Sequence, residues 1–324
     1  MAMKKLLARV VLASLPLIML GGCTQQSTGL DSYIRGQIDA QNNHTNRAIA
    51  ELNTAIEKNP QLELAFQALG DLYLKKGDYH QAAGSFQRAS ELNPWSFHNF
   101  YSLGLTRQQL REFVRAIAAY QRALEIQPKS KKTTINLAVA YAQNGKPFMG
   151  ILYGKRAIKD GSNSFSTWVN LGAIYAQAAQ SDPGYRRHAI HYYKQSLELQ
   201  PHQPAIYLNL AGVYISEKRF TTALHVLTTG AKLAPSPAID ERAGYCEYRL
   251  GNLSAATRAY NAALAKFPNY TPAINGLGVV NMAGYLKDNS QTNLKTKALN
   301  LWLRSLAINP NQPPINKLIK QFGH

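Results

Sequence analysis

Amide side chains recur at a regular interval through the middle of this 324-residue chain. One series consists of Asn136, Asn170 and Asn209, and a second consists of Gln109, Gln143 and Gln177, whose members are 34 residues apart. A carboxamide both donates and accepts hydrogen bonds, so a row of them can bond the N–H and C=O groups of an extended peptide regardless of its side chains. The spacing therefore predicts a peptide-binding surface, provided that the fold brings the amides onto one face.

Two arginines extend this surface toward the C-terminus. Arg242 and Arg249 are seven residues apart, about two helical turns, and lie beside Tyr245 and Tyr248. Two guanidinium groups on one face can hold a carboxylate or a phosphate. Pairing with the three acidic residues of the segment 240–247 is an equally good interpretation.

The amides belong to a 34-residue unit that recurs eight times between about Asp31 and Pro310. In the clearest copy, residues 63–96, the signature places are filled by Phe66, Leu69, Gly70, Tyr73, Ala82, Phe86, Ala89 and Pro94. This pattern resembles the tetratricopeptide repeat (TPR), a hairpin of two helices. The resemblance implies an all-α fold, a right-handed α-solenoid of about eight TPR helix-turn-helix repeats over residues 31–312. The helical spacing of Ile315, Leu318, Ile319 and Phe322 predicts an amphipathic capping helix over 313–324.

The repeat pattern has a physical reason. Small residues let two helices approach, aromatic residues fill the adjoining holes, and proline ends the second helix. One hairpin cannot bury its apolar face alone, so the repeats must stack. In TPR proteins the first helix of each hairpin forms the concave binding face, and the three asparagines fall at position 6 and the three glutamines at position 13 of that helix. Asparagine at position 6 is also common in TPR consensus sequences, so part of the ladder reflects family membership.

Another TPR binding device is not reproduced. The carboxylate clamp of the family needs Lys and Asn at positions 5 and 9, where the first repeat has Tyr33 and Gln37. Recognition of a chaperone's acidic tail is therefore not expected.

Two repeats are longer than the others. Repeat five has five extra residues around 178–188, and repeat eight has eight around 284–297, both between the two helices of the hairpin. The sequence predicts a loop in each place, projecting from the same edge. Either the loops are tolerated drift in length, or they contact a partner.

The first 22 residues read as an export signal, with Lys4, Lys5 and Arg9 before an apolar run that is too short to span a bilayer. Leu20–Gly21–Gly22–Cys23 resembles the lipobox of bacterial lipoproteins. The resemblance implies cleavage after residue 22, lipidation of Cys23 and a short tether over 23–30. Because Thr24 stands where inner-membrane lipoproteins have Asp, it also implies anchoring in the outer membrane, facing the periplasm.

The net charge is +18, and removal of the three cations in the signal leaves +15. Such a surface favours acidic proteins, anionic lipid headgroups or envelope polysaccharides, and a solvated surface without a specific ligand is an equal interpretation. Nucleic acid is not an expected partner, because an exported chain rarely meets it and the sequence contains no nucleic-acid recognition module.

No catalytic, cofactor or metal site is expected. His188 and His191 have no acidic or thiol partner placed with them, and Cys246 falls on the inward side of a repeat, as a buried structural thiol would. The sequence therefore favours a non-catalytic adaptor in the cell envelope that binds a peptide segment of another envelope protein. The alternatives are a factor like the pilotins of type IV pilus and secretin assembly, a basic structural protein that binds a surface, and a subunit of an enzyme. The oligomeric state does not follow from the sequence.

Overall fold

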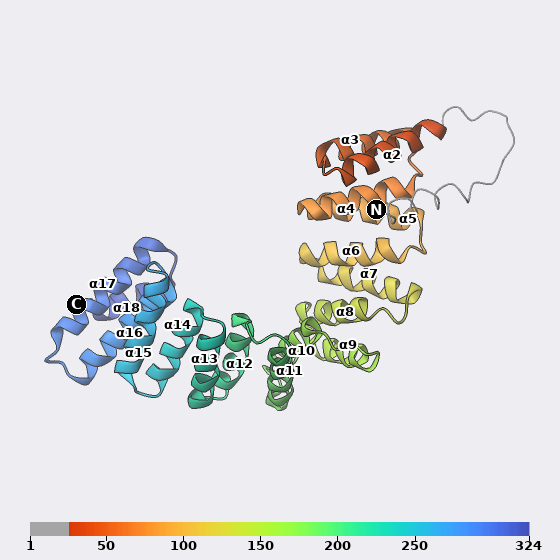
Figure 1. Ribbon diagram of the computed structural model, residues 1–324. Helices are drawn as coiled ribbons and strands as arrows, with labels where there is room; N and C mark the ends of the chain where they lie inside the picture. The colour runs from red at the N-terminus through yellow and green to blue at the C-terminus, as the bar shows by residue number, and fades with distance from the viewer. Residues whose placement is uncertain (1–25, 324) are drawn as a thin grey trace, which may run out of the picture. The chain divides into compact units, whose positions relative to one another are not determined.

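The computed structural model describes residues 26–323, so Cys23 and the signal segment 1–22 lie outside it. All regular structure in this range is helical (Figure 1). The first six helices are α2 Gln26–Gln41, α3 Thr45–Lys58, α4 Glu63–Lys76, α5 Tyr79–Leu92, α6 Phe97–Gln109 and α7 Phe113–Ile126. The next six are α8 Lys131–Gln143, α9 Pro147–Lys159, α10 Phe165–Ala178, α11 Arg186–Leu199, α12 Pro204–Ser216 and α13 Phe220–Leu233. The last five are α14 Pro237–Arg249, α15 Leu253–Lys266, α16 Thr271–Lys287, α17 Thr292–Ile308 and α18 Pro313–Phe322, and one 3-10 turn, η1 Pro183–Tyr185, precedes α11.

The helices pair into eight successive hairpins, from α2 with α3 to α16 with α17. The chain divides into two compact units at residue 128: the first contains the hairpins of α2–α7, and the second contains those of α8–α17 together with α18. Within each unit the second helix of one hairpin packs against the first helix of the next. The structure thus confirms an all-α solenoid of eight repeats.

The signature residues pack as the repeat pattern requires. A Cβ atom on Gly172 of α10 would lie only 2.6 Å from a ring carbon of Tyr193 in α11, so glycine is needed for the ring to lie against the helix backbone. Trp302 occupies the same place against Gly278 in the last hairpin and is fully buried. Gly70 with Phe86, Gly104 with Tyr120 and Gly244 with Tyr260 form the same contact in three other repeats.

The last helix covers the end of the second unit. In α18, Ile315 is buried, and Leu318, Ile319 and Phe322 pack on a cluster that contains Trp302. Lys317 and Lys320 alternate with these residues and face solvent. The expected capping helix is confirmed.

Two expectations need correction. The tether expected over 23–30 is helical from Gln26 onward, because α2 begins there. In repeat eight the extra residues do not form a loop: α16 and α17 each have 17 residues, three or four more than the helices of most other repeats, and only 288–291 connect them. An insertion whose residues favour helix can lengthen both flanking helices, since each added turn gains hydrogen bonds. Repeat five has the expected loop, with η1 inside it.

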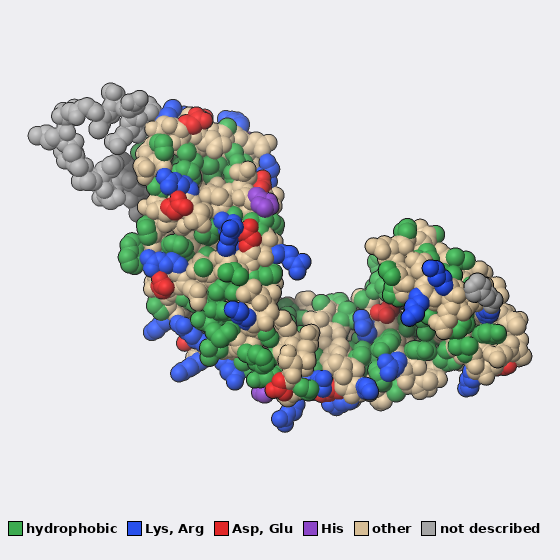
Figure 2. Space-filling view, turned by 180° about the vertical axis from the view of Figure 1, so that it is seen from behind, with side chains coloured by type: hydrophobic (Ala, Val, Ile, Leu, Met, Phe, Trp, Pro, Cys, Tyr) green, Lys and Arg blue, Asp and Glu red, His purple; other side chains and the backbone are tan. Residues whose placement is uncertain are grey.

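The net positive charge of the mature chain is confined to one unit. Residues 24–128 contain ten Lys and Arg and ten Asp and Glu, whereas residues 129–324 contain 23 and eight. The whole excess of +15 therefore belongs to the second unit. Figure 2 shows Lys and Arg side chains spread over one face of the molecule, with fewer acidic side chains among them.

Within residues 26–323, none of the helices is both long enough and apolar enough to cross a membrane.

Candidate peptide-binding groove

The asparagine series occupies equivalent places on three helices of the second unit. Asn136, Asn170 and Asn209 are each the sixth residue of their helix, in α8, α10 and α12. Local signals fix where these helices begin: the Ser164 hydroxyl accepts a hydrogen bond from the Thr167 N–H at the start of α10, and α12 begins with Pro204. Asn209 is exposed, and the other two are partly buried.

The three glutamines lie at or next to the ends of their helices. Gln109 ends α6 in the first unit, Gln143 ends α8, and Gln177 is next to last in α10. The Gln177 side chain donates a hydrogen bond from Nε2 to the carbonyl oxygen of Ala142, at 2.9 Å. The same carbonyl oxygen also accepts the Gly145 N–H at 2.9 Å, so the amide adds a second hydrogen bond at the end of α8. Gln177 therefore contributes to the packing of repeats four and five.

The two arginines have different surroundings. Arg249 donates a hydrogen bond to the Tyr245 hydroxyl at 2.7 Å, and its guanidinium lies over the Phe220 ring, 4.5 Å from the ring centre. Arg242 reaches the carboxylate of Glu241 only at 3.8 Å, and 46% of its side chain is exposed. Burial raises the pKa of Glu241, and the neighbouring Arg242 opposes that shift. Arg249 is thus held by aromatic rings, whereas Arg242 faces open space.

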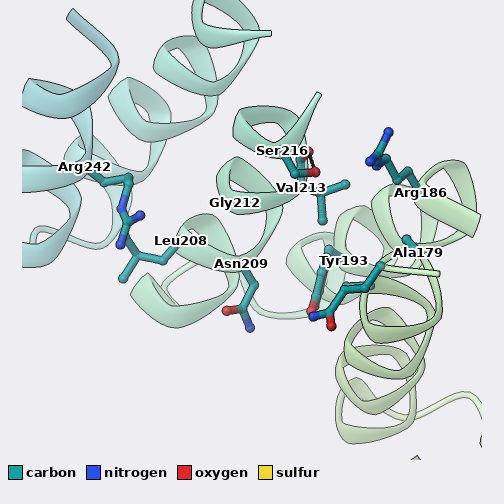
Figure 3. A pocket seen from close by; sticks show the side chains of 11 residues that line it. Ala179, Arg186, Tyr193, Leu208, Asn209, Gly212, Val213, Ser216 and Arg242 are labelled. Atoms are coloured by element: carbon teal, nitrogen blue, oxygen red, sulfur yellow. Dashed lines mark hydrogen bonds between the residues drawn. The ribbon is translucent and has the colours of Figure 1, made fainter. Parts of the chain in front are cut away.

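Arg242 and Asn209 line a hollow formed by α10, α11, α12 and α14, in repeats five to seven. Its volume is about 420 Å³, and we call it the central hollow. The polar lining consists of Gln180, Arg186, Asn209, Ser216 and Arg242, and the apolar lining consists of Ala176, Ala179, Tyr193, Leu208, Gly212 and Val213. Figure 3 shows Arg242 beside Leu208 on one side of the hollow and Arg186 on the other. Asn136, Asn170, Arg249 and the glutamine series do not line it.

The floor of the hollow is shaped by Gly212 in α12. A Cβ atom at this position would meet no other atom within 4 Å, so the backbone of α12 borders open space here and a larger side chain would enter it. Tyr193 borders the same space, and burial raises its pKa to about 12, so its hydroxyl stays protonated at neutral pH. The hollow therefore combines an uncharged apolar floor with two guanidinium groups, two amides and a hydroxyl in its polar lining.

The loop of repeat five brings one of these guanidiniums to the hollow. Asp182 accepts a hydrogen bond from the Gly184 N–H at 2.9 Å, which forms the turn before Arg186 starts α11. Sequence reasoning named this loop but not Arg186 as a groove residue. Gly212 and Ser216 also lie at groove positions of α12. Neither residue type recurs at its position in the other repeats, so the repeat pattern did not single them out.

The remaining candidates, His188 and Cys246, are engaged in packing. His188 stacks on Tyr175, with the two ring centres 5.0 Å apart. Cys246 is fully buried, and burial raises its pKa to about 11. In the range 26–323 no three His, Cys, Asp or Glu side chains are grouped so that they could hold a metal ion.

Comparison with known proteins agrees with this architecture. A tetratricopeptide repeat family model matches residues 35–89, 67–131, 101–165 and 217–271, and a second such model matches residues 187–241. The chain belongs to the tetratricopeptide repeat family. Folds of this family are suited to protein–protein interaction.

Solved structures of TPR proteins have the same fold. A tetratricopeptide repeat protein from Parabacteroides merdae is 13% identical, with a TM-score of 0.58 over 78% of this chain and 99% of its own. PilW, described as a widely conserved type IV pilus biogenesis factor, is 21% identical, with a TM-score of 0.56 over 66% of this chain and 97% of its own.

One curated relative is similar over a shorter stretch. A heat shock protein sti1 homolog of Schizosaccharomyces pombe is 35% identical over 107 residues, 33% of this chain. The match spans only 18% of the length of that relative.

Proposed function

We propose that this protein is a non-catalytic adaptor that is lipid-anchored in the cell envelope through Cys23 and binds an extended segment of a partner protein in the central hollow. The observation that carries the proposal is the composition of the hollow. Asn209, Ser216 and Arg242 surround an apolar floor that Gly212 leaves open. Amide and hydroxyl groups bond a peptide backbone, a guanidinium group donates hydrogen bonds to its carboxylates, and the floor takes an apolar side chain.

A larger side chain at Gly212 tests whether the central hollow binds the peptide. Gly212→Leu places a side chain in the hollow, and Gly84→Leu in α5 is its control, because a Cβ atom on Gly84 also meets nothing within 4 Å. Both changes favour helix formation, so neither is expected to unfold the protein. Peptides selected from a random phage-displayed library against the wild-type protein should bind Gly212→Leu at least tenfold more weakly and bind Gly84→Leu unchanged. Equal binding to all three proteins would remove the central hollow from the proposal.

The asparagine series requires its own test. The triple change of Asn136, Asn170 and Asn209 to Ala is compared with wild type by crosslinked co-purification from intact envelopes. We expect a specific partner to be lost, because backbone hydrogen bonds from the ladder are removed. Retention of the partner by this variant, with loss by Gly212→Leu, restricts the binding site to the hollow.

The anchor is tested separately. Mass spectrometry of the N-terminal tryptic peptide Cys23–Arg35 should show a diacylglyceryl thioether, and Cys23→Ser should leave an unmodified, uncleaved precursor. A free thiol at Cys23 in the mature protein contradicts the anchor and the outer-membrane location, and leaves the peptide-binding assignment intact.

The similarity to PilW supports a narrower alternative, in which the adaptor acts in assembly of a type IV pilus or its secretin. Deletion of the gene should then abolish surface pili, with restoration by wild type and not by Gly212→Leu. The charge of the second unit supports the other alternative, a basic protein that binds anionic lipid or polysaccharide. Sedimentation with vesicles or with isolated cell-wall polysaccharide, lost on charge reversal of surface lysines, distinguishes it from the adaptor.

A further inference from the structure

The second helix of repeat four exposes three large apolar side chains. In α9, Phe148 is 49% exposed, Met149 is 38% exposed and Leu152 is 59% exposed. They are the second, third and sixth residues of the helix, so they share one face. We call these three residues the α9 patch.

The fold does not require apolar residues at these places. Six other second helices, namely α3, α5, α7, α11, α13 and α15, start at the equivalent position of their repeats. In α5 the corresponding residues are His80, Gln81 and Gly84, and among the six helices only Val114 of α7 is a large aliphatic side chain. Repeat packing therefore does not explain the α9 patch.

The patch continues onto the loop of repeat five. The ring of Phe148 packs on that of Tyr185 in η1, with 5.6 Å between the ring centres. Tyr185 also contacts Tyr175, and the next residue, Arg186, lines the central hollow. The loop thus borders both the α9 patch and the central hollow.

Positive charge exceeds negative charge near the patch. The segment 146–160, which contains α9, has four cations, Lys146, Lys155, Arg156 and Lys159, and one acidic residue, Asp160, which lies 3.9 Å from Arg156. The loop adds Arg187 and Asp182, which are both exposed. The unit that contains both segments carries the whole basic excess of the mature chain.

We propose that the α9 patch, with η1, is a second docking surface, and that it binds an acidic amphipathic helical segment of a partner protein. Apolar residues of that segment cover Phe148, Met149 and Leu152, and its carboxylates face the lysines of α9. Met, aromatic and Arg side chains are enriched at protein interfaces, and complementary charge selects and orients the partner. A bilayer is the less favoured occupant, because only 49% of Phe148 is exposed and its ring already packs on Tyr185, which leaves less of it available for insertion.

The test uses the full mature chain and three probes. The first is a fluorescein-labelled 18-residue helical peptide of Leu and Glu with one apolar face, the second is the same peptide with Lys in place of Glu, and the third is vesicles of phosphatidylethanolamine and phosphatidylglycerol. The wild-type protein should bind the acidic peptide, with weaker binding at high salt, and should not bind the lysine peptide.

Leu152→Asp should weaken binding of the acidic peptide at least tenfold. Its control is Val114→Asp, which places the same charge on an exposed aliphatic position, 68% exposed, of another second helix. Gly212→Leu should leave this binding unchanged, so failure of the central hollow and failure of the α9 patch are separate results. Circular dichroism confirms that the variants fold.

Three results would overturn the proposal. Equal weakening by Leu152→Asp and Val114→Asp reduces the effect to net charge. Equal binding of the lysine peptide removes the requirement for acidic partners. Binding of wild-type protein to vesicles that Leu152→Asp abolishes, without binding of the acidic peptide, assigns the patch to a bilayer.

Discussion

Gln177 Nε2 donates to the carbonyl oxygen of Ala142 across 2.9 Å, and this bond joins the last turn of α8 to the last turn of α10. The Ala142 carbonyl oxygen also accepts the Gly145 N–H at 2.9 Å, so the amide adds a bond between repeats to a carbonyl that is already paired locally. The residue belongs to a series that the sequence assigned to peptide binding. Its side-chain amide is instead used within the solenoid.

Gln177→Met, which keeps the length of the side chain and removes its amide, should lower the free energy of unfolding by about 1 kcal/mol. The measurement is urea denaturation followed by circular dichroism. Gln195→Met is the control, because Gln195 bonds only Glu198 on an exposed face of its own helix, and its loss should cost about 0.5 kcal/mol or less. Equal effects of the two changes would show that the bond to Ala142 contributes nothing beyond an exposed contact.

Gly278→Ala should destabilise the last hairpin by about 2 kcal/mol, because the added Cβ atom clashes with the indole of Trp302. Gly212→Ala makes the same chemical change where the Cβ atom meets nothing, and should stabilise the protein by about 0.5–1 kcal/mol. Thermal denaturation of the two variants should therefore shift the midpoint in opposite directions. Shifts in the same direction contradict the close contact of Gly278 with Trp302.

Ile315→Ala should release the capping helix, at a cost of about 2–4 kcal/mol for a buried isoleucine. The change exposes the cluster around Trp302, so tryptophan fluorescence should shift to longer wavelength at lower urea than in wild type. Lys317→Ala on the exposed face is the control and should change neither quantity. An unfolding transition of Ile315→Ala at the same urea concentration as wild type would mean that α18 does not stabilise the last repeat.

Cys246 should not react with Ellman's reagent at pH 8 until the protein is unfolded, because the thiol is buried and its pKa is raised to about 11. The assay uses Cys23→Ser, so that Cys246 is the one thiol present.

The same pKa predicts a pH dependence. The unfolded chain loses the thiol proton near pH 9 and the folded chain near pH 11, so the thiol's contribution to stability is complete below pH 9 and is lost as the pH rises toward 11. The free energy of unfolding of wild type should fall more steeply over this range than that of Cys246→Ala. Parallel curves for the two proteins would contradict the raised pKa.

Much of the fold follows from local patterns. The repeat pattern predicted that small residues and aromatic residues pack together, and Gly172 with Tyr193 and Gly278 with Trp302 do so. The capping helix follows from the spacing of Ile315, Leu318, Ile319 and Phe322 alone. The extra residues of repeat eight were misjudged, because length relative to the consensus does not say whether an insertion forms a loop or extends the helices beside it.

The candidate site was less predictable. The sequence placed Asn209 and Arg242 at groove positions, and the structure puts both on the central hollow. It also grouped Arg249 with Arg242, and the structure separates them, because Phe220 from the preceding helix holds Arg249. That contact depends on packing between hairpins, which a repeat position does not specify.

The sequence by itself determined the repeat, the family, the number of hairpins and the positions that can face a ligand, because each of these depends on residues within one 34-residue unit. Only the tertiary structure decided which of those positions border open space and which are already used. The amide of Gln177 is used in stacking, Gly212 borders open space in the hollow, and the loop of repeat five brings Tyr185 onto the α9 patch and Arg186 into the hollow. The physical reason is that a free hydrogen-bonding group or an empty volume is a property of the neighbouring repeats, and stacking brings those neighbours together from outside the unit that a sequence pattern describes.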